Sequence, residues 1–68
     1  MYMNRPFILL VDIFNACIPT QNIQIVDEIT DTVIVEGKAV ELTDLLNKYG
    51  NNEVYRIEPH NNTLLIEI

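Results

Sequence analysis

His60 and Cys17 are the residues whose types suggest chemistry, because the chain has one histidine and one cysteine. A catalytic histidine needs an orienting carboxylate and a nucleophile within hydrogen-bond reach. Glu58 is near His60, but Cys17 would have to be the nucleophile, since the chain has no serine. The pattern Phe14-x-x-Cys17-Ile18 instead places the thiol on the apolar face of an expected helix, where cysteine behaves as a small hydrophobe. We therefore predict no catalytic residue and no enzyme activity.

Metal and phosphate sites are not indicated either. Structural zinc needs four Cys or His ligands and catalytic zinc needs three, whereas the chain offers one of each. Calcium loops need alternating carboxylates with a glycine at the bend, and the acidic run from Asp27 to Asp31 has no glycine. The two glycines, Gly37 and Gly50, form no phosphate-binding motif. We predict no metal and no cofactor.

Acidic residues are the most conspicuous group in the sequence. Six of them fall within eighteen positions, relieved by Lys38 alone: Asp27, Glu28, Asp31, Glu36, Glu41 and Asp44. We predict that four of them form a negative surface that binds a partner, namely Asp27, Glu28, Asp31 and Glu36. The alternative is a solvated hairpin edge whose charges discourage edge-to-edge aggregation.

A small-ligand groove is a second possibility. Tyr49, Tyr55 and Arg56 fall near the expected second helix and third strand, where they could line such a groove. The alternative assigns the tyrosines to core packing and Arg56 to the ordinary surface.

Charge and composition restrict the classes of partner. Ten acids against four basic residues give a net charge of −6 and a pI near 4.3. Nucleic-acid binding needs clustered Lys and Arg, so we predict a protein partner with a neutral or basic surface. A single cysteine favours a reducing, cytoplasmic setting. Sixty-eight residues predict one domain with a small core, which a homodimer would complete.

The N-terminal run RPFILLVDIF has some features of a secretory signal, since an arginine precedes apolar residues. Asp12 interrupts the run, and Phe14-Asn15-Ala16 is a poor lead-in to a cleavage site. The run is also much shorter than the roughly 20 apolar residues of a membrane span. We therefore interpret it as part of the fold and predict no membrane association.

Hydrophobic spacing predicts the first half of the fold. Apolar residues at helical spacing predict a helix over 6–18 that stops at Pro19, although the same residues could form a buried strand. Alternation predicts a strand over 22–27, and β-branched residues predict its return over 32–36. The loop 28–31 connects them into a hairpin.

The second half repeats this pattern. Leucines at helical spacing predict a helix over 41–49, with Gly50 in the left-handed conformation after it. The strands EVYRIE and TLLIEI follow, separated by a loop over 59–62 in which His60 is exposed. The order α-β-β-α-β-β predicts an α+β domain over 1–68: an antiparallel sheet of about four strands, with two helices on one face. The last strand, Thr63–Ile68, is a candidate sheet edge for a structural or assembly dimer.

Residues 18 to 68 resemble a group of small acidic proteins encoded by phages and prophages of Gram-positive bacteria. The matching features are the alternating strand after Ile18-Pro19, the Glu36-Gly37-Lys38-Ala39 exit and the Leu45-Leu46 helix. The resemblance implies a phage origin and a host-cell cytoplasmic setting, with no assigned reaction. We therefore expect a protein that binds and modulates or inhibits a host or phage protein, for instance in anti-defence. An oligomeric small-ligand binder is the alternative.

Overall fold

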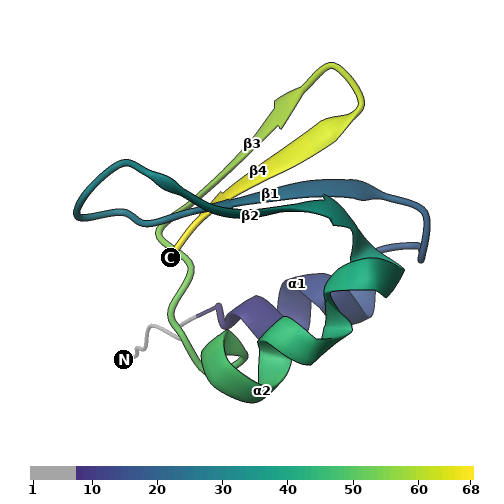
Figure 1. The fold of residues 1–68 in the computed structure, drawn as a ribbon, viewed down its shortest axis with the longest axis horizontal. Coiled ribbons are helices and arrows are strands. Elements are labelled where there is room, and N and C mark those ends of the chain that lie inside the picture. The colour runs from purple at the N-terminus through teal and green to yellow at the C-terminus, as the bar shows by residue number, and fades with distance from the viewer. Residues whose placement is uncertain (1–7) are drawn as a thin grey trace, which may run out of the picture.

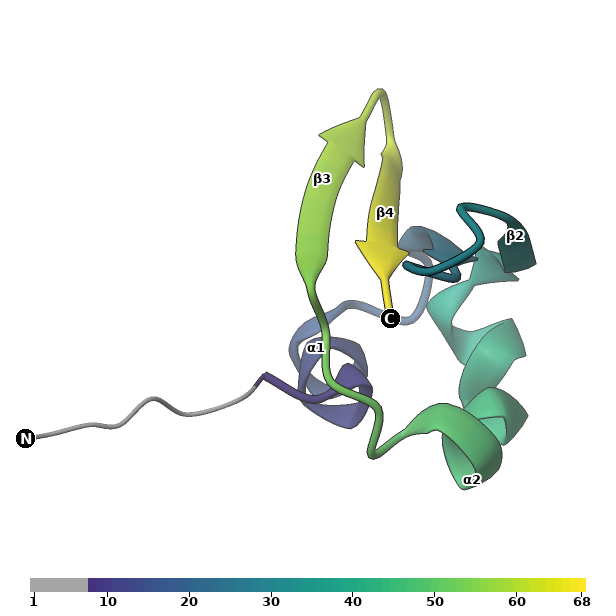
Figure 2. The ribbon, with the colours of Figure 1, turned by 90° about the vertical axis from the view of Figure 1, so that its left-hand side faces the viewer.

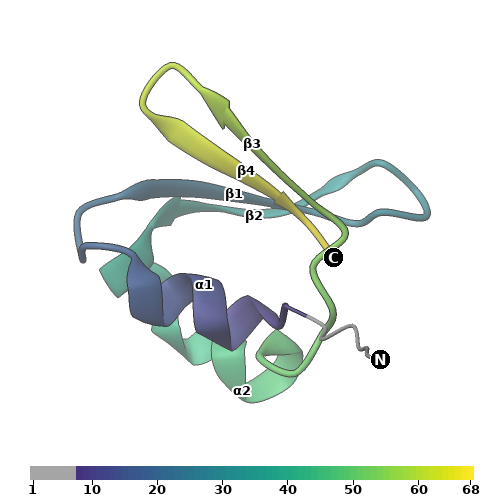
Figure 3. The same ribbon diagram turned by 180° about the vertical axis from the view of Figure 1, so that it is seen from behind.

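The computed structural model describes residues 8–68. Two helical segments and a four-stranded sheet form a small α+β domain in the predicted order α-β-β-α-β-β (Figure 1). Both helical segments lie on the same face of the sheet, as Figure 1 and the opposite view in Figure 3 show. The predicted fold class and the placement of the helices are confirmed.

Helix α1 spans Leu10–Ala16, within the predicted range, so the strand alternative for this segment is wrong. Asp12 stabilises its first turn because its carboxylate accepts a hydrogen bond from the Leu9 amide at 3.1 Å. The backbone is already extended at Cys17, and Pro19 further disfavours helical geometry at Ile18, the residue before it. The predicted positions 6 and 7 lie outside the described residues.

Strands β1 (Asn22–Val26) and β2 (Val33–Lys38) form the predicted antiparallel hairpin. Its register pairs Ile23 with Gly37 and Ile25 with Val35, and then shifts so that Val26 pairs with Val33. Ile34 is therefore an extra residue on β2, a bulge that bends the outer strand.

The predicted second helix begins earlier than expected and has two parts. A 3-10 helix, η1, spans Ala39–Leu45, and a single α-helical turn, α2, spans Leu46–Tyr49. The Ala39 amide donates to the Gln21 carbonyl at 2.9 Å, and the Val40 amide donates to the Pro19 carbonyl at 3.0 Å. These bonds to the α1–β1 loop fix where the first turn begins, which the local apolar spacing does not encode.

The prediction for Gly50 is wrong. Its φ is −57° and its ψ −32°, so the residue continues the right-handed turn, and its amide donates to the Leu46 carbonyl at 3.0 Å. A Cβ at this position would lie 2.5 Å from that same oxygen. Glycine is therefore required for close approach of the backbone, and left-handed geometry plays no part.

Strands β3 (Arg56–His60) and β4 (Thr63–Glu67) form the closing antiparallel hairpin. The predicted loop 59–62 is too long, because Pro59 and His60 pair with Leu64 and Thr63 as parts of the strands. The loop is only Asn61-Asn62, with Asn61 at φ 56°. Asparagine tolerates this left-handed conformation, which two-residue hairpin loops require.

The sheet order is β2-β1-β4-β3, and the central pair β1–β4 is parallel. The sheet is thus mixed, and the prediction of a wholly antiparallel sheet is wrong at this pair. The prediction that Thr63–Ile68 forms an edge is also wrong, because β4 lies between β1 and β3. The segment η1–α2 carries the chain beneath the sheet from one edge to the other, and this crossover makes the central pair parallel.

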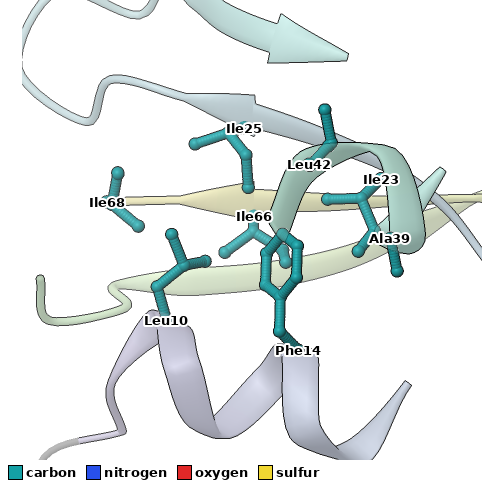
Figure 4. Close-up of a cluster of buried hydrophobic side chains, with 8 residues drawn as sticks. All are labelled: Leu10, Phe14, Ile23, Ile25, Ala39, Leu42, Ile66 and Ile68. Carbon is teal, nitrogen blue, oxygen red and sulfur yellow. The ribbon is translucent and has the colours of Figure 1, made fainter. Parts of the chain in front are cut away.

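The core lies between the sheet and the helices (Figure 4). Its eight buried side chains come from α1, β1, η1 and the β4 end: Leu10, Phe14, Ile23, Ile25, Ala39, Leu42, Ile66 and Ile68. Ile66 and Ile68 share one face of the last strand, as the alternation predicts. Cys17 is half-buried and packs against this core, consistent with its predicted role as a small hydrophobe.

Candidate functional site

The loop between β1 and β2, Asp27–Thr32, forms a compact turn that we call the acidic tip. The Asp27 Oδ1 atom accepts hydrogen bonds from the amides of Ile29 at 2.8 Å and Thr30 at 3.1 Å. The Asp27 amide donates to the Thr32 carbonyl at 2.8 Å, and the Asp31 amide donates to the Asp27 carbonyl at 2.7 Å. Asp27 therefore organises the turn through its side chain and its backbone.

Two further contacts hold the acidic tip in place. The Glu28 amide donates to the Ile68 carbonyl at 2.8 Å, which ties the tip to the end of the chain's last strand. The hydroxyls of Thr30 and Thr32 lie 2.7 Å apart, within hydrogen-bond distance. Asp31 adopts φ 58°, a left-handed conformation that aspartate tolerates better than most residues. The tip is thus a preorganised turn.

The tip presents an apolar side chain between two carboxylates. Ile29 is 88% exposed, the highest value among the large exposed hydrophobic residues of the described chain. Glu28 and Asp31 flank it and are exposed. Within residues 8–68, the structure shows no hydrogen bond or salt bridge to either carboxylate. The result is an isoleucine held at the apex of a negatively charged turn.

The other predicted acids lie elsewhere. Glu36 is exposed on β2 and pairs with Gln24 of β1, on the sheet face away from the helices. It is five residues further along the chain than Asp31 and belongs to the strand rather than to the turn. Glu41 accepts a hydrogen bond from the Lys38 amide at 2.9 Å, at the start of η1. The structure therefore brings together Asp27, Glu28 and Asp31, and it places Glu36 apart from them.

The predicted ligand-groove residues have separate surroundings. Tyr49 is half-buried against the core, with the Lys48 Nζ atom 5.2 Å from its ring centre. Tyr55 is exposed, and the Arg56 guanidinium forms a salt bridge with Glu67 at 2.6 Å. None of the three lines either of the hollows described next.

Two open hollows are present in the described part of the chain. One of about 360 Å³ lies between the α1–β1 loop and the β3–β4 hairpin tip. It is lined by uncharged residues: Ile18, Thr20, Gln21, Asn22, Pro59, Asn61, Asn62, Thr63 and Leu64. Gln21 bridges its two sides, because its Nε2 atom donates to the carbonyls of Asn22 at 3.0 Å and Asn62 at 3.1 Å. The other, about 200 Å³ and mostly apolar, lies between α1 and η1 and includes Cys17.

His60 and Cys17 lie on different elements, in different chemical environments. The His60 Nε2 atom lies 2.8 Å from Glu58 Oε1, and the histidine side chain is 61% exposed. This hydrogen bond, aided by the charge of Arg56, lowers the pKa of Glu58. Burial raises the pKa of the Cys17 thiol, which favours the uncharged form. The predicted exposure of His60 is confirmed, although it ends a strand.

Sequence reasoning missed Ile29. In DEITD it reads as a single apolar residue in a polar connecting loop, and nothing in the pattern distinguishes a buried loop residue from an exposed one. The signal that could have found it is Asp27 two positions earlier, because an aspartate at that spacing commonly bonds the amide that follows.

Comparisons with protein-family models, curated proteins and solved structures give no match to this chain. In residues 8–68, no helix has the length and apolar character needed to cross a membrane. The same residues contain no group of three or more His, Cys, Asp or Glu side chains placed to hold a metal ion.

Proposed function

We propose that this protein is a non-enzymatic binding module that engages another protein through the acidic tip. Ile29 inserts into an apolar depression on the partner, while Glu28 and Asp31 face basic groups around it. The observation that carries the proposal is the 88% exposure of Ile29 on a turn fixed by Asp27. Binding there modulates or inhibits the partner by covering the surface that the tip occupies.

Preorganisation distinguishes this isoleucine from ordinary surface hydrophobics, which are common singly. A loop that is already ordered loses little conformational entropy on binding. An apolar anchor surrounded by polar groups is also the usual arrangement of an interface hot spot. The backbone bonds at Asp27 and Glu28 supply the order, and the exposed Ile29 supplies the anchor.

Charge determines the kind of partner. The net charge of −6 favours a basic or neutral protein surface, and it speeds encounter with a basic one. It disfavours nucleic acid, whose phosphates would be repelled. Glu36 lies outside the tip and contributes to long-range attraction rather than to the contact. If the resemblance to phage proteins reflects origin, the partner is a host or phage protein in the cytoplasm.

Affinity capture from a bacterial lysate tests the proposal. Wild-type bait is compared with Ile29→Ser, with Glu28→Gln/Asp31→Asn and with Asp44→Lys on η1, which changes the net charge by the same two units as the double variant. Asp27 is left intact, because changing it would disturb the turn itself. We expect a captured protein that is lost with both tip variants, retained with Asp44→Lys and weakened by salt. Capture that is equal for all four baits would overturn the proposal.

A second candidate function, binding of an uncharged small molecule, is favoured by the hollow beside the β3–β4 hairpin. Its lining offers amide and hydroxyl groups together with the apolar surfaces of Ile18, Pro59 and Leu64. A bound ligand would raise the melting temperature by mass action. A thermal-shift screen of nucleosides, sugars and common metabolites tests this function, with Gln21→Ala as the variant expected to lose the shift. No shift for any compound would reject it.

A further inference from the structure

Strand β3 is an outer strand of the sheet, with β4 as its one neighbour among the described strands (Figure 2). His60 and Thr63 flank the two-residue loop and form a hydrogen-bonded pair, after which backbone groups alternate between inward and outward directions. The outward positions of β3 are therefore Pro59 and Ile57. Pro59 has no N–H, so Ile57 supplies both the outward donor and an outward acceptor.

An apolar row crosses the helix-covered face of the sheet and ends at this edge. The paired residues Val35, Ile25, Ile66 and Ile57 come from β2, β1, β4 and β3 in spatial order. Ile25 and Ile66 are fully buried, whereas Ile57 is 40% exposed. Tyr55, just before β3, is 59% exposed. The row thus stops at a half-exposed isoleucine whose backbone can pair further.

The charges on the opposite face of β3 are self-complementary. Suppose that a second copy aligns antiparallel, with the two Ile57 residues opposite each other. Arg56 of each copy then lies opposite Glu58 of the other. Such cross-strand pairs are stabilising when their charges are opposite. Centring the pairing on Glu58 instead would place like charges directly opposite. Charge and apolar contact therefore select the Ile57-centred register.

We propose that β3 pairs with β3 of a second copy about a two-fold axis at Ile57, giving a continuous eight-stranded sheet. The apolar row then continues across the interface through the two isoleucines. On the other face the charges alternate in sign across the interface, from Glu67 and Arg56 of one copy to Glu58 of the second copy. Arg56 already contacts Glu67 of its own chain at 2.6 Å. In the dimer its guanidinium would lie between this carboxylate and that of Glu58 from the second copy.

Pro59 limits this pairing to one short segment. In the proposed register it lies opposite Tyr55 of the second copy, whose amide already donates to its own Glu67 carbonyl at 2.8 Å. Neither residue of this pair therefore offers an amide to the other: Pro59 has none, and that of Tyr55 is already bonded. Proline on an edge strand also discourages longer, indiscriminate pairing. The short match at Ile57 favours a closed dimer over a growing sheet.

The opposite edge is less suited to the same contact. Strand β2 carries the bulge at Ile34, which disrupts regular pairing. It also passes directly into η1 at Ala39. Val33 on β2 is, like Ile57, a large exposed hydrophobic residue on an outer strand, which makes it the control position for the Ile57 variants.

Analytical ultracentrifugation of the full chain tests the proposal. The wild type should show a mass of twice 7.8 kDa at high micromolar concentration and dissociate on dilution. Glu58→Arg places two arginines opposite each other in each pair and should weaken the dimer at least about tenfold. Arg56→Glu/Glu58→Arg/Glu67→Arg should restore association, since the charges of the pairs between copies and of the Arg56–Glu67 pair within each copy are then exchanged together. Val33→Lys should have no effect, whereas Ile57→Lys should give a monomer.

A cysteine placed on the axis gives an independent readout. In a Cys17→Ala background, Ile57→Cys should form a disulfide-linked dimer on mild oxidation, because hydrogen-bonded strand pairs hold Cα atoms about 5.5 Å apart. Val33→Cys should link much more slowly. A wild type that stays at 7.8 kDa throughout, or equal linking at both positions, would overturn the proposal.

Discussion

The acidic tip holds three acidic residues with different structural roles: Asp27, Glu28 and Asp31. Asp27 uses an oxygen to hold the amides of Ile29 and Thr30, while the carboxylates of Glu28 and Asp31 remain exposed. The sequence predicted that Glu28 and Asp31 lie on the connecting loop and that Asp27 ends the strand before it. It could not predict this division, because which carboxylate bonds its own backbone depends on the turn geometry.

Replacing Asp27 should therefore affect stability, whereas replacing Glu28 should not. Asp27→Ala removes a charged acceptor from two backbone donors, so we expect a loss of about 1–2 kcal/mol in the free energy of unfolding. Glu28→Gln should change it by less than about 0.5 kcal/mol. Urea denaturation followed by circular dichroism measures both. Equal effects would show that Asp27 does not organise the turn.

The pair formed by Glu58 and His60 gives a pH-dependent prediction. The histidine hydrogen bond, and secondly the charge of Arg56, lower the pKa of Glu58 in the folded protein. The pair therefore stabilises the fold above the unfolded-state pKa of Glu58, and this contribution is lost as pH falls through the lower folded value. Because both side chains are largely solvent-exposed, the contribution is small.

Carboxyl chemical shifts followed by NMR titration test that assignment directly. His60→Ala should raise the pKa of Glu58 towards its ordinary value, and Arg56→Ala should raise it by a smaller amount. The order matters, because the hydrogen bond is the larger cause. A Glu58 pKa that is unchanged by His60→Ala would remove the hydrogen bond as its cause.

At the level of elements, local sequence patterns predicted where the strands and helices lie better than they predicted which strands pair with each other. Alternation in NIQIV and TLLIEI correctly indicated strands with one buried face. Alternation is the same for parallel and antiparallel neighbours, however, so it could not reveal that β1 lies beside β4. Pairing across more than forty residues depends on how η1–α2 crosses the sheet. The first residue of η1 could not be predicted either, because it depends on hydrogen bonds from the amides of Ala39 and Val40 to the α1–β1 loop.

Gly50 provides the sharpest test of an element boundary. Gly50→Ala brings a Cβ within 2.5 Å of the Leu46 carbonyl oxygen, so the backbone must shift. We expect a loss of about 1–3 kcal/mol in stability, although alanine is the better helix former. Gly37→Ala should cost less, because its closest contacts, at 3.3 Å, are the movable side chains of Glu41 and Leu42. Thermal melts of both variants make the comparison, and a more stable Gly50→Ala protein would contradict it.

The whole molecule rests on a small core, which limits how much change it tolerates. Eight buried side chains hold two layers together, and a chain of this size has a net stability of about 3–5 kcal/mol. The length of the chain predicted this limit, because a short chain can bury only a small core. The alternation of the last strand indicated that Ile66 is buried, whereas the exposure of Ile29 was not predicted, because its loop carries no such pattern.

A matched pair of isoleucine variants tests this view of the core. Ile66→Ala removes a fully buried side chain from a central strand and should cost about 2–5 kcal/mol, enough to leave much of the protein unfolded. Ile29→Ala should leave the free energy of unfolding nearly unchanged. Chemical denaturation distinguishes them, and comparable losses would mean that the tip is part of the core.

The two proposed contacts lie on different parts of the molecule and can fail separately. The acidic tip belongs to the β1–β2 hairpin, and the self-pairing edge belongs to β3. Tip variants should leave the dimer intact, and edge variants should leave the tip's intrinsic affinity intact. A two-fold dimer would present two tips. Dissociation of the dimer would therefore lower the avidity of binding to a multivalent partner.

The most direct test of the central claim is the dissociation constant of the captured partner for wild type and for Ile29→Ser, measured by calorimetry with both proteins folded. If the acidic tip is the binding surface, losing its apolar anchor should raise the dissociation constant at least about tenfold. The exposed control Asp44→Lys should leave it within about twofold. An unchanged dissociation constant for Ile29→Ser would contradict the account.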